Sequence, residues 1–287
     1  MKKDYLDILA NLKETDNKSK GPNDRVLLID GLNTFIRSYT CNPSTNEDGI
    51  HVGGIKGFLL SIGYAIRTIK PTRVIICFDG KGGSARRKKL FPAYKAQRTF
   101  NVRLTRINSN TSVEDEKVSM GQQIQRLSQY LDKLPVTVMS PERIEADDAI
   151  AYIAKQVLPN SQHFIMSTDT DFLQLVDERI QVWSPTAKKF YFRKDMQERF
   201  NLKPENYILY KSPGIKGLGQ KTLEKRLPIL FGSETITMDN ILEYAEKHKS
   251  DAKVIADVAS NKDLLELNYK LMQLEEVEIS GQAKEYC

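Results

Sequence analysis

Short apolar runs alternate with helical patterns along the first two thirds of the chain. Five of these runs are continuous enough to be buried strands, and they span residues 25–30, 72–79, 135–140, 163–169 and 179–185. Between them, apolar residues recur at helical spacing over residues 55–69 and 145–158. Strands that alternate with helices predict an α/β fold with a mostly parallel sheet and flanking helices.

Both ends of the chain lack this alternation. Residues 1–24 predict a short amphipathic helix and a polar linker, which we interpret as an N-terminal extension. From about Lys203 the strand pattern stops, and residues 204–287 are predicted to be helical. We therefore expect an α/β domain over residues 25–203 and a smaller helical region over residues 204–287.

The composition of the chain indicates which kind of partner it binds and in which cellular compartment it works. The chain has 287 residues, a formal net charge of +6 and a pI of about 9.0, which favours a polyanionic partner. Its three cysteines form no CxxC pair, so neither a zinc site nor a disulfide framework is indicated. No apolar run approaches the length of a membrane span. We expect a cytoplasmic protein, in the host-cell cytoplasm if it comes from a phage.

Seven acidic residues lie where predicted strands end or where a predicted helix begins: Asp30, Asp79, Glu145, Asp147, Asp148, Asp169 and Asp171. Ligands of parallel sheets bind beyond the carboxyl ends of the strands. Each acid alone is explained as a turn former or a helix N-cap. Together they need a cation, because like charges raise one another's pKa. Oxygen ligands without histidine or cysteine suit Mg²⁺ or Mn²⁺, and two such ions can activate a water for phosphodiester cleavage.

A long basic stretch follows the second predicted strand. Residues 80–113 contain no acidic residue and nine basic ones: Lys81, Arg86, Arg87, Lys88, Lys89, Lys95, Arg98, Arg103 and Arg106. A charged run is usually a solvated face, but this one suits the backbone of a nucleic acid. Tyr94, Lys95 and Arg98 are close enough on a helix to face the same way. A ring there could stack on a base, and a cation could stabilise charge on a phosphate.

The segment "PGIKGLGQKT" predicts a glycine-rich turn between two helices. It lacks the Walker spacing and follows no strand, so neither type of nucleotide-binding turn fits. Backbone N–H groups of such a turn can approach a phosphate closely. A structural helix–turn–helix corner is the alternative. The residues that would contact a duplex are Gly214, Lys216, Gly217, Gly219 and Lys221.

Five segments together resemble the successive motifs of the flap endonuclease (5′-nuclease) family: "LLIDGLNTFIRSY", "CFDGKGGSARRKKLFPAYKAQR", "RIEADDAIAYIA", "STDTDFLQLV" and "PGIKGLGQKT". That family includes the 5′–3′ exonuclease domain of bacterial DNA polymerase I and phage ribonuclease H enzymes. The resemblance covers roughly residues 25–235. It implies a PIN-like α/β nuclease domain and a helical arch, which we expect over residues 80–120. It also implies a helix-hairpin-helix-type module that grips duplex DNA, commonly around a K⁺ ion.

The resemblance also implies roles for single residues. The seven acidic residues match the cluster that holds two divalent ions, Mg²⁺ or Mn²⁺. Lys95 and Arg98 match the arch residues that contact the scissile phosphate, and Tyr94 matches a stacking position. The implied substrate is branched or nicked duplex DNA with a 5′ single strand, or an RNA primer on DNA. We expect a monomer that binds no membrane.

One segment departs from the family pattern. In the family, a sequence resembling GDxSDN lies just before the glycine-rich hairpin, and its two aspartates help to hold the second metal ion. Here "LYKS" runs directly into "PGIKG", so the pair is absent. Two explanations are open. Either this sequence omits a short loop, or the protein lacks the loop and would hold a second ion weakly.

The sequence therefore predicts a metal-dependent, structure-specific 5′ nuclease of DNA replication or repair. The alternative is a structure-specific DNA-binding protein whose catalysis is impaired, which the absent pair favours. A phosphatase of the haloacid dehalogenase type also has aspartates at strand ends. That type needs a D-x-D nucleophile after the first strand, where this chain has "DGLNT".

Overall fold

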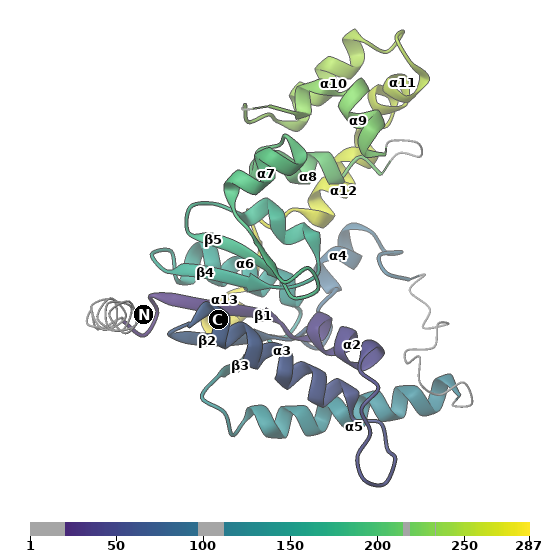
Figure 1. Cartoon of the computed structure of the whole chain (residues 1–287). Coiled ribbons are helices and arrows are strands. Elements are labelled where there is room, and N and C mark those ends of the chain that lie inside the picture. The colour runs from purple at the N-terminus through teal and green to yellow at the C-terminus, as the bar shows by residue number, and fades with distance from the viewer. Residues whose placement is uncertain (1–20, 97–111, 215–218, 233) are drawn as a thin grey trace, which may run out of the picture.

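A six-stranded sheet forms the centre of the molecule in a computed structural model that describes residues 21–96, 112–214, 219–232 and 234–287 (Figure 1). The strand order is β3-β2-β1-β4-β5-β6, and only β6 runs antiparallel to its neighbour. The strands are β1 Arg25–Asp30, β2 Arg73–Cys77, β3 Thr137–Met139, β4 Gln162–Met166, β5 Ile180–Ser184 and β6 Lys189–Tyr191. The predicted α/β fold with a mostly parallel sheet is confirmed.

The sequence pattern located five of the six strands. Two of them, β2 and β4, end two and three residues earlier than predicted, so that Asp79 and Asp169 lie in the loops after these strands. The pattern missed β6, because this short edge strand has only three residues and no run of apolar side chains. The predicted helix at the N-terminus falls within residues 1–20, which lie outside the described residues.

Alternate residues of β1 enter two different cores, as the pleat of a strand requires. Leu27 and Ile29 pack in a cluster with residues of α2, α3 and α5. Val26 and Leu28 pack in a second, larger cluster that extends from α6 to α13. The two clusters lie on opposite faces of the sheet, so the sheet is buried between two layers of helices.

The helices divide between these layers. On the side of the first cluster are α2 Gly31–Cys41, α3 Gly53–Ile69 and α5 Val113–Leu131. α4 Ala85–Leu90 lies beyond the carboxyl end of β2. On the other side, α6 Ala146–Tyr152 continues as the π-helical turn η1 Ile153–Val157. The 3₁₀-helix η2 Thr170–Leu175 follows β4, and α7 Arg193–Phe200 follows β6.

Among the described residues from 204 to 287, the regular elements are all helices, as predicted. These elements are α8 Pro204–Lys211, α9 Gln220–Arg226, the 3₁₀-helix η3 Pro228–Leu230, α10 Met238–Lys247, α11 Lys253–Ser260, α12 Lys262–Met272 and α13 Gly281–Tyr286. In Figure 1, α7 to α12 extend away from the sheet, whereas α13 returns to it. The middle of the expected arch, residues 97–111, lies outside the described residues.

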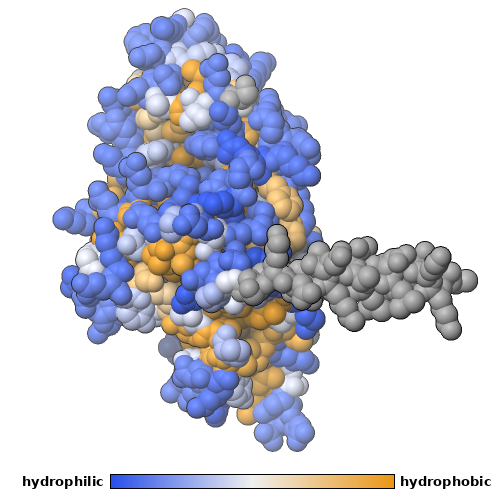
Figure 2. Space-filling view, turned by 90° about the vertical axis from the view of Figure 1, so that its left-hand side faces the viewer, coloured by the Kyte–Doolittle hydropathy of each residue, from blue (hydrophilic) through white to orange (hydrophobic). Residues whose placement is uncertain are grey.

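The side of the molecule where β1 begins lies away from the carboxyl ends of the strands. Figure 2 views this side, where hydrophilic residues predominate and hydrophobic ones gather in patches, most of them in the lower half. Within the described part of the chain, no helix combines the length and the apolar character needed to cross a membrane.

Candidate active site

Three of the predicted acidic residues lie at the carboxyl ends of neighbouring strands. Asp30 is the last residue of β1, while Asp79 and Asp169 lie just beyond β2 and β4. β1 is hydrogen-bonded to both of these strands. The carboxylates are close enough that Asp79 and Asp169 each raise the pKa of Asp30. The structure therefore brings these three side chains to one edge of the sheet.

Each of these aspartates also caps a helix or turn. Asp30 Oδ1 accepts a hydrogen bond from Asn33 N at 3.1 Å. Asp79 Oδ1 accepts one from Ala146 N at 2.8 Å, at the start of α6. Asp169 Oδ1 accepts one from Asp171 N at 2.9 Å. The capping explanation and the site explanation are thus compatible, because each cap uses only one of the two carboxylate oxygens.

Asp30 has the most perturbed environment of the three. Burial raises the pKa of its carboxyl to about 6, and the charges of Asp79 and Asp169 add to the effect. Hydrogen bonds from Asn33 N and from Ser167 Oγ, at 3.1 Å from Oδ2, oppose the rise in pKa. A positive charge at this position would relieve the crowding.

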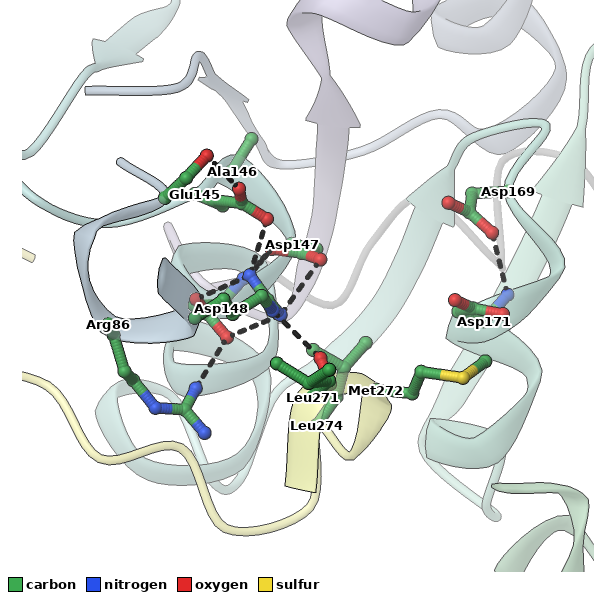
Figure 3. A network of polar contacts seen from close by, with 12 residues as sticks. Arg86, Glu145, Ala146, Asp147, Asp148, Asp169, Asp171, Leu271, Met272 and Leu274 are labelled. Atoms are coloured by element: carbon green, nitrogen blue, oxygen red, sulfur yellow. Dashed lines mark hydrogen bonds and ion pairs between the residues drawn. The ribbon is translucent and has the colours of Figure 1, made fainter. Parts of the chain in front are cut away.

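The second acidic group surrounds an arginine. Figure 3 shows the carboxylates of Glu145, Asp147 and Asp148 directed toward one place, with Asp169 and Asp171 lying apart from them. Arg87 Nη1 lies 2.5 Å from Glu145 Oε2 and 3.0 Å from Asp148 Oδ2. Arg87 Nη2 lies 3.1 Å from Asp147 Oδ2. Glu145 and Asp148, three residues apart, thus lie on one side of the helix start, where both accept hydrogen bonds from Arg87 Nη1.

Arg87 is buried, whereas a residue that contacts DNA would be exposed. Its side chain is 2% exposed, and its Nε donates a hydrogen bond to the backbone oxygen of Leu271 at 2.8 Å. The guanidinium therefore joins α4, α6 and the end of α12. Arg86 is 22% exposed and lies 3.3 Å from Asp148 Oδ1, so it remains accessible from solvent.

Tyr94 and Lys95 approach the same acidic group from outside it. Tyr94 Oη donates to Glu145 Oε2 at 3.2 Å, and Lys95 Nζ lies 2.7 Å from Glu145 Oε1. Burial opposes ionisation of Glu145. Even so, hydrogen bonds from Lys95 and Ser84 and the charge of Arg87 lower its pKa. The predicted shared helix is wrong here, because residues 92–96 form a turn in which Lys95 has φ +58°. Arg98 lies outside the described residues.

Asp171 has a partner that the sequence did not indicate. Lys211, the last residue of α8, places its Nζ 2.7 Å from Asp171 Oδ1. Burial and the neighbouring Asp169 raise the pKa of Asp171, and Lys211 opposes that rise. Nothing in the sequence marked Lys211 except its position beside the missing aspartate pair.

Other site residues were also missed. Asn33 Oδ1 accepts hydrogen bonds from Thr168 N and Oγ1, which ties the start of α2 to the loop after β4. Ser84 Oγ lies 2.6 Å from Glu145 Oε1. Short polar residues next to a strand-end acid are the signal that could have identified Asn33 and Ser167. Ser84 has no such signal, because its partner is distant in sequence.

The glycine-rich turn lies partly outside the described residues, since these exclude Lys216 and Gly217. Gly214 has φ +59°, and a Cβ there would lie 2.4 Å from Asn268 Nδ2. Only glycine suits this position. Gly219 precedes α9, and Lys221 is exposed in its first turn.

The acidic residues are not gathered around one point. In the part of the chain that the structure describes, no three acidic, histidine or cysteine side chains are arranged to hold a single metal ion. Basic side chains stand between the carboxylates instead: Arg87 among Glu145, Asp147 and Asp148, and Lys211 beside Asp171.

Known proteins are similar in sequence to most of this chain. Residues 25–201 match the family model of the 5′-3′ exonuclease, N-terminal resolvase-like domain. Flap endonuclease Xni of Shewanella sediminis is 28% identical over 263 residues, which cover 87% of this chain and 91% of that protein. The 5′-3′ exonuclease of Buchnera aphidicola is 29% identical over 269 residues, covering 88% and 87%. The chain spans only 31% of the thermostable DNA polymerase I of Thermus filiformis, at 26% identity over 279 residues that cover 91% of this chain.

Solved structures share the fold at lower identity. The T5 D15 protein co-crystallised with metal ions has a TM-score of 0.64 and 21% identity, covering 88% of this chain and 90% of that one. The catalytic core of Rad2 in complex with DNA has a TM-score of 0.50 and 15% identity, covering 89% and 79%. Because the family model spans more than half of the chain, the protein belongs to the 5′-3′ exonuclease family of nuclease enzymes, through its N-terminal resolvase-like domain.

Proposed function

We propose that this protein is a divalent-metal-dependent, structure-specific 5′ nuclease. Its substrates would be flaps, nicks or RNA primers on duplex DNA during replication or repair. The relatives named flap endonuclease and 5′-3′ exonuclease support this substrate class. The observation that carries the proposal is the position of Asp30, Asp79 and Asp169 at the carboxyl ends of three neighbouring parallel strands, β1, β2 and β4.

We propose that Asp30, Asp79 and Asp169 hold a divalent ion. Their donors are carboxylate oxygens, which suit Mg²⁺ or Mn²⁺. A bound ion of this kind polarises a phosphoryl oxygen and lowers the pKa of a coordinated water. Since the described carboxylates do not yet share one point, their side chains must turn toward the ion as it binds.

The other acidic residues fit an ion less well. Glu145 and Asp148 are 3% and 4% exposed and are paired with Arg87. Asp147 is also paired with Arg87 but keeps 34% of its side chain exposed, so of the three it is the one we retain as a proposed ligand if Arg87 is displaced. A second ion at this group would have to displace the guanidinium of Arg87.

The DNA contacts are proposed from exposure and charge. Lys95 is 25% exposed and Arg86 22%, and both lie at the edge of the acidic site, where they could bind a phosphate. Lys221 is exposed at the start of α9, beside the turn that begins at Gly214. We propose that this turn contacts the duplex backbone away from the cleaved bond.

A labelled 5′-flap duplex and a duplex with a 5′ RNA primer test the proposal. We expect Mg²⁺-dependent cleavage from the 5′ end, complete loss of activity with EDTA, and a rate at least about 100-fold lower for Asp169→Ala. Asp132→Ala, at an exposed position after α5, should cleave at the wild-type rate. Cleavage by the wild type in EDTA would falsify the metal-dependent mechanism.

A second candidate function is structure-specific DNA binding with impaired catalysis. The ion pair between Lys211 and Asp171 favours it, because this pair takes up a carboxylate otherwise available to a metal ion. Flap binding that persists in EDTA, with no cleavage across a series of Mg²⁺ and Mn²⁺ concentrations, would support this candidate over the nuclease.

A further inference from the structure

Lys211 places a fixed positive charge against one of the candidate metal ligands. Its Nζ lies 2.7 Å from Asp171 Oδ1, and it donates a hydrogen bond to Thr170 Oγ1 at 2.9 Å. The two charged side chains are 29% and 28% exposed, so solvent screens the pair less than it screens an exposed pair. Burial opposes the charge of Lys211, yet its bonds to Asp171 raise its pKa.

The packing of α8 determines where this ammonium lies. Tyr207, Ile208 and Leu209 are each 3% exposed, and Ser212, which follows Lys211, is 1% exposed. A cation in the last turn of a helix also interacts favourably with the negative end of the helix dipole. The backbone of Lys211 is therefore held in place by buried residues before and after it in the sequence. Its side chain extends from this anchored position to Asp171.

The residues after Lys211 add no carboxylate to the site. Ser212 and Pro213 lead directly to Gly214, whose left-handed conformation lies closely against Asn268. Divalent ions such as Mg²⁺ need carboxylates that are not already neutralised. An ion beside Asp171 would meet a carboxylate already paired with an ammonium group. The residues present therefore do not fit a second ion at this position.

We propose that Lys211 takes the place of a second metal ion. The protein then binds one divalent ion at Asp30, Asp79 and Asp169, and the ammonium group supplies the other positive charge that faces the phosphate. An ammonium is a compact point charge with three donors, so it can contact a phosphoryl oxygen directly. This inference rests on the proposed metal-dependent nuclease function.

Mn²⁺ binding measures the number of ions without relying on activity. We would titrate the intact protein with Mn²⁺ and follow free Mn²⁺ by electron paramagnetic resonance. The expected result is one bound ion per chain at saturation. Two bound ions would overturn the inference and leave the proposed function standing. No bound ion would overturn both.

Reversing the charge at Lys211 tests whether the ammonium excludes the second ion. We expect Lys211→Glu to bind two Mn²⁺ ions, because it frees Asp171 and adds a carboxylate beside it. Lys203→Glu is the matched control: Lys203 is the residue before α8, and its Nζ bonds only to the Thr235 hydroxyl among the described residues. A single bound ion in Lys211→Glu would overturn the inference.

Removing the charge without adding a ligand tests its part in cleavage. At saturating Mg²⁺, Lys211→Gln should cleave the 5′ flap about 100-fold more slowly than Lys203→Gln, because it lacks a charge that faces the phosphate. Its Mn²⁺ stoichiometry should stay at one. A rate equal to that of the control would overturn the role of the ammonium.

Discussion

At the scale of single residues, the carboxylates that we propose to bind the ion are also caps of helices or turns. Asp30, Asp79 and Asp169 each give one oxygen to a backbone N–H group. This bond orients the side chain before any ion arrives, and preorganised ligands lose less entropy on binding. A strand-end aspartate that also caps a helix or turn is therefore suited to ion binding by the same local geometry.

The raised pKa of Asp30 should make the stability of the metal-free protein depend on pH. This pKa is raised from 3.8 to about 6 in the folded chain, so between these pH values the folded chain binds more protons than the unfolded one. Stability of the metal-free protein should therefore fall as pH rises through this window. In EDTA at pH 7.5, we expect Asp30→Asn to raise the free energy of unfolding by about 3 kcal/mol. The gain should vanish below about pH 4, as urea unfolding would show.

Adding Mg²⁺ should reverse the order of stability. If the ion binds as proposed, the wild type should gain stability from it, and Asp30→Asn, which lacks the charge of this proposed ligand, should gain less. Asp132→Asn controls for removing an exposed carboxylate. A metal-free Asp30→Asn protein that is less stable than the wild type at pH 7.5 would contradict the crowded environment inferred for Asp30.

At the scale of elements, α4 is held in place by a charge rather than by apolar packing. Arg87 is the buried residue of this six-residue helix, and its partners come from α6 and α12. The sequence predicted the acidic residues of α6 and the basic residues before it, because each group is contiguous. It could not predict that they pair, since the partners are about 60 residues apart in sequence and periodicity carries no information on such contacts.

Arg87 therefore predicts a large effect on stability. Arg87→Met keeps the length of the side chain but removes the one buried cation of the group, so Glu145 and Asp148 keep only the partly exposed Lys95 and Arg86 as positive partners. We expect the metal-free protein to lose about 3–5 kcal/mol of unfolding free energy at pH 7.5, measured by urea unfolding. Arg86→Met is the control, and it should lose less than about 1 kcal/mol because Arg86 is partly exposed and makes one contact of 3.3 Å. Equal losses in the two variants would contradict a clamping role for Arg87.

At the scale of the whole molecule, the sheet and the helical region share one core. The larger hydrophobic cluster contains Val26 of β1, Leu209 of α8 and Ala283 of α13. In the sequence, the pattern changes from strands to helices after residue 203. That a domain boundary lies there remains a prediction. Local patterns revealed the change from strands to helices, but they could not show that both parts bury their apolar faces together.

Gln174 is a polar link within this shared core. Its side chain is 1% exposed. Its Nε2 donates hydrogen bonds to the backbone oxygens of Met272, at 3.1 Å, and of Asp171, at 2.8 Å. Its Oε1 accepts a hydrogen bond from Leu274 N at 2.9 Å. Through these bonds η2 holds the chain segment that follows α12, so the candidate site and the C-terminal helices depend on one another.

We therefore expect the described parts of the protein to unfold as one cooperative unit. Fluorescence of Trp183, which is 2% exposed in β5, reports on the sheet, and circular dichroism at 222 nm reports on all helices. The two urea transitions should coincide. Gln174→Ala should shift both together by about 2–3 kcal/mol, because it leaves buried backbone groups without partners. Gln197→Ala, on the exposed surface of α7, should shift neither. Loss of helical signal at urea concentrations where the fluorescence of Trp183 is unchanged would show that the helical region unfolds independently, and that the shared core does not couple it to the sheet.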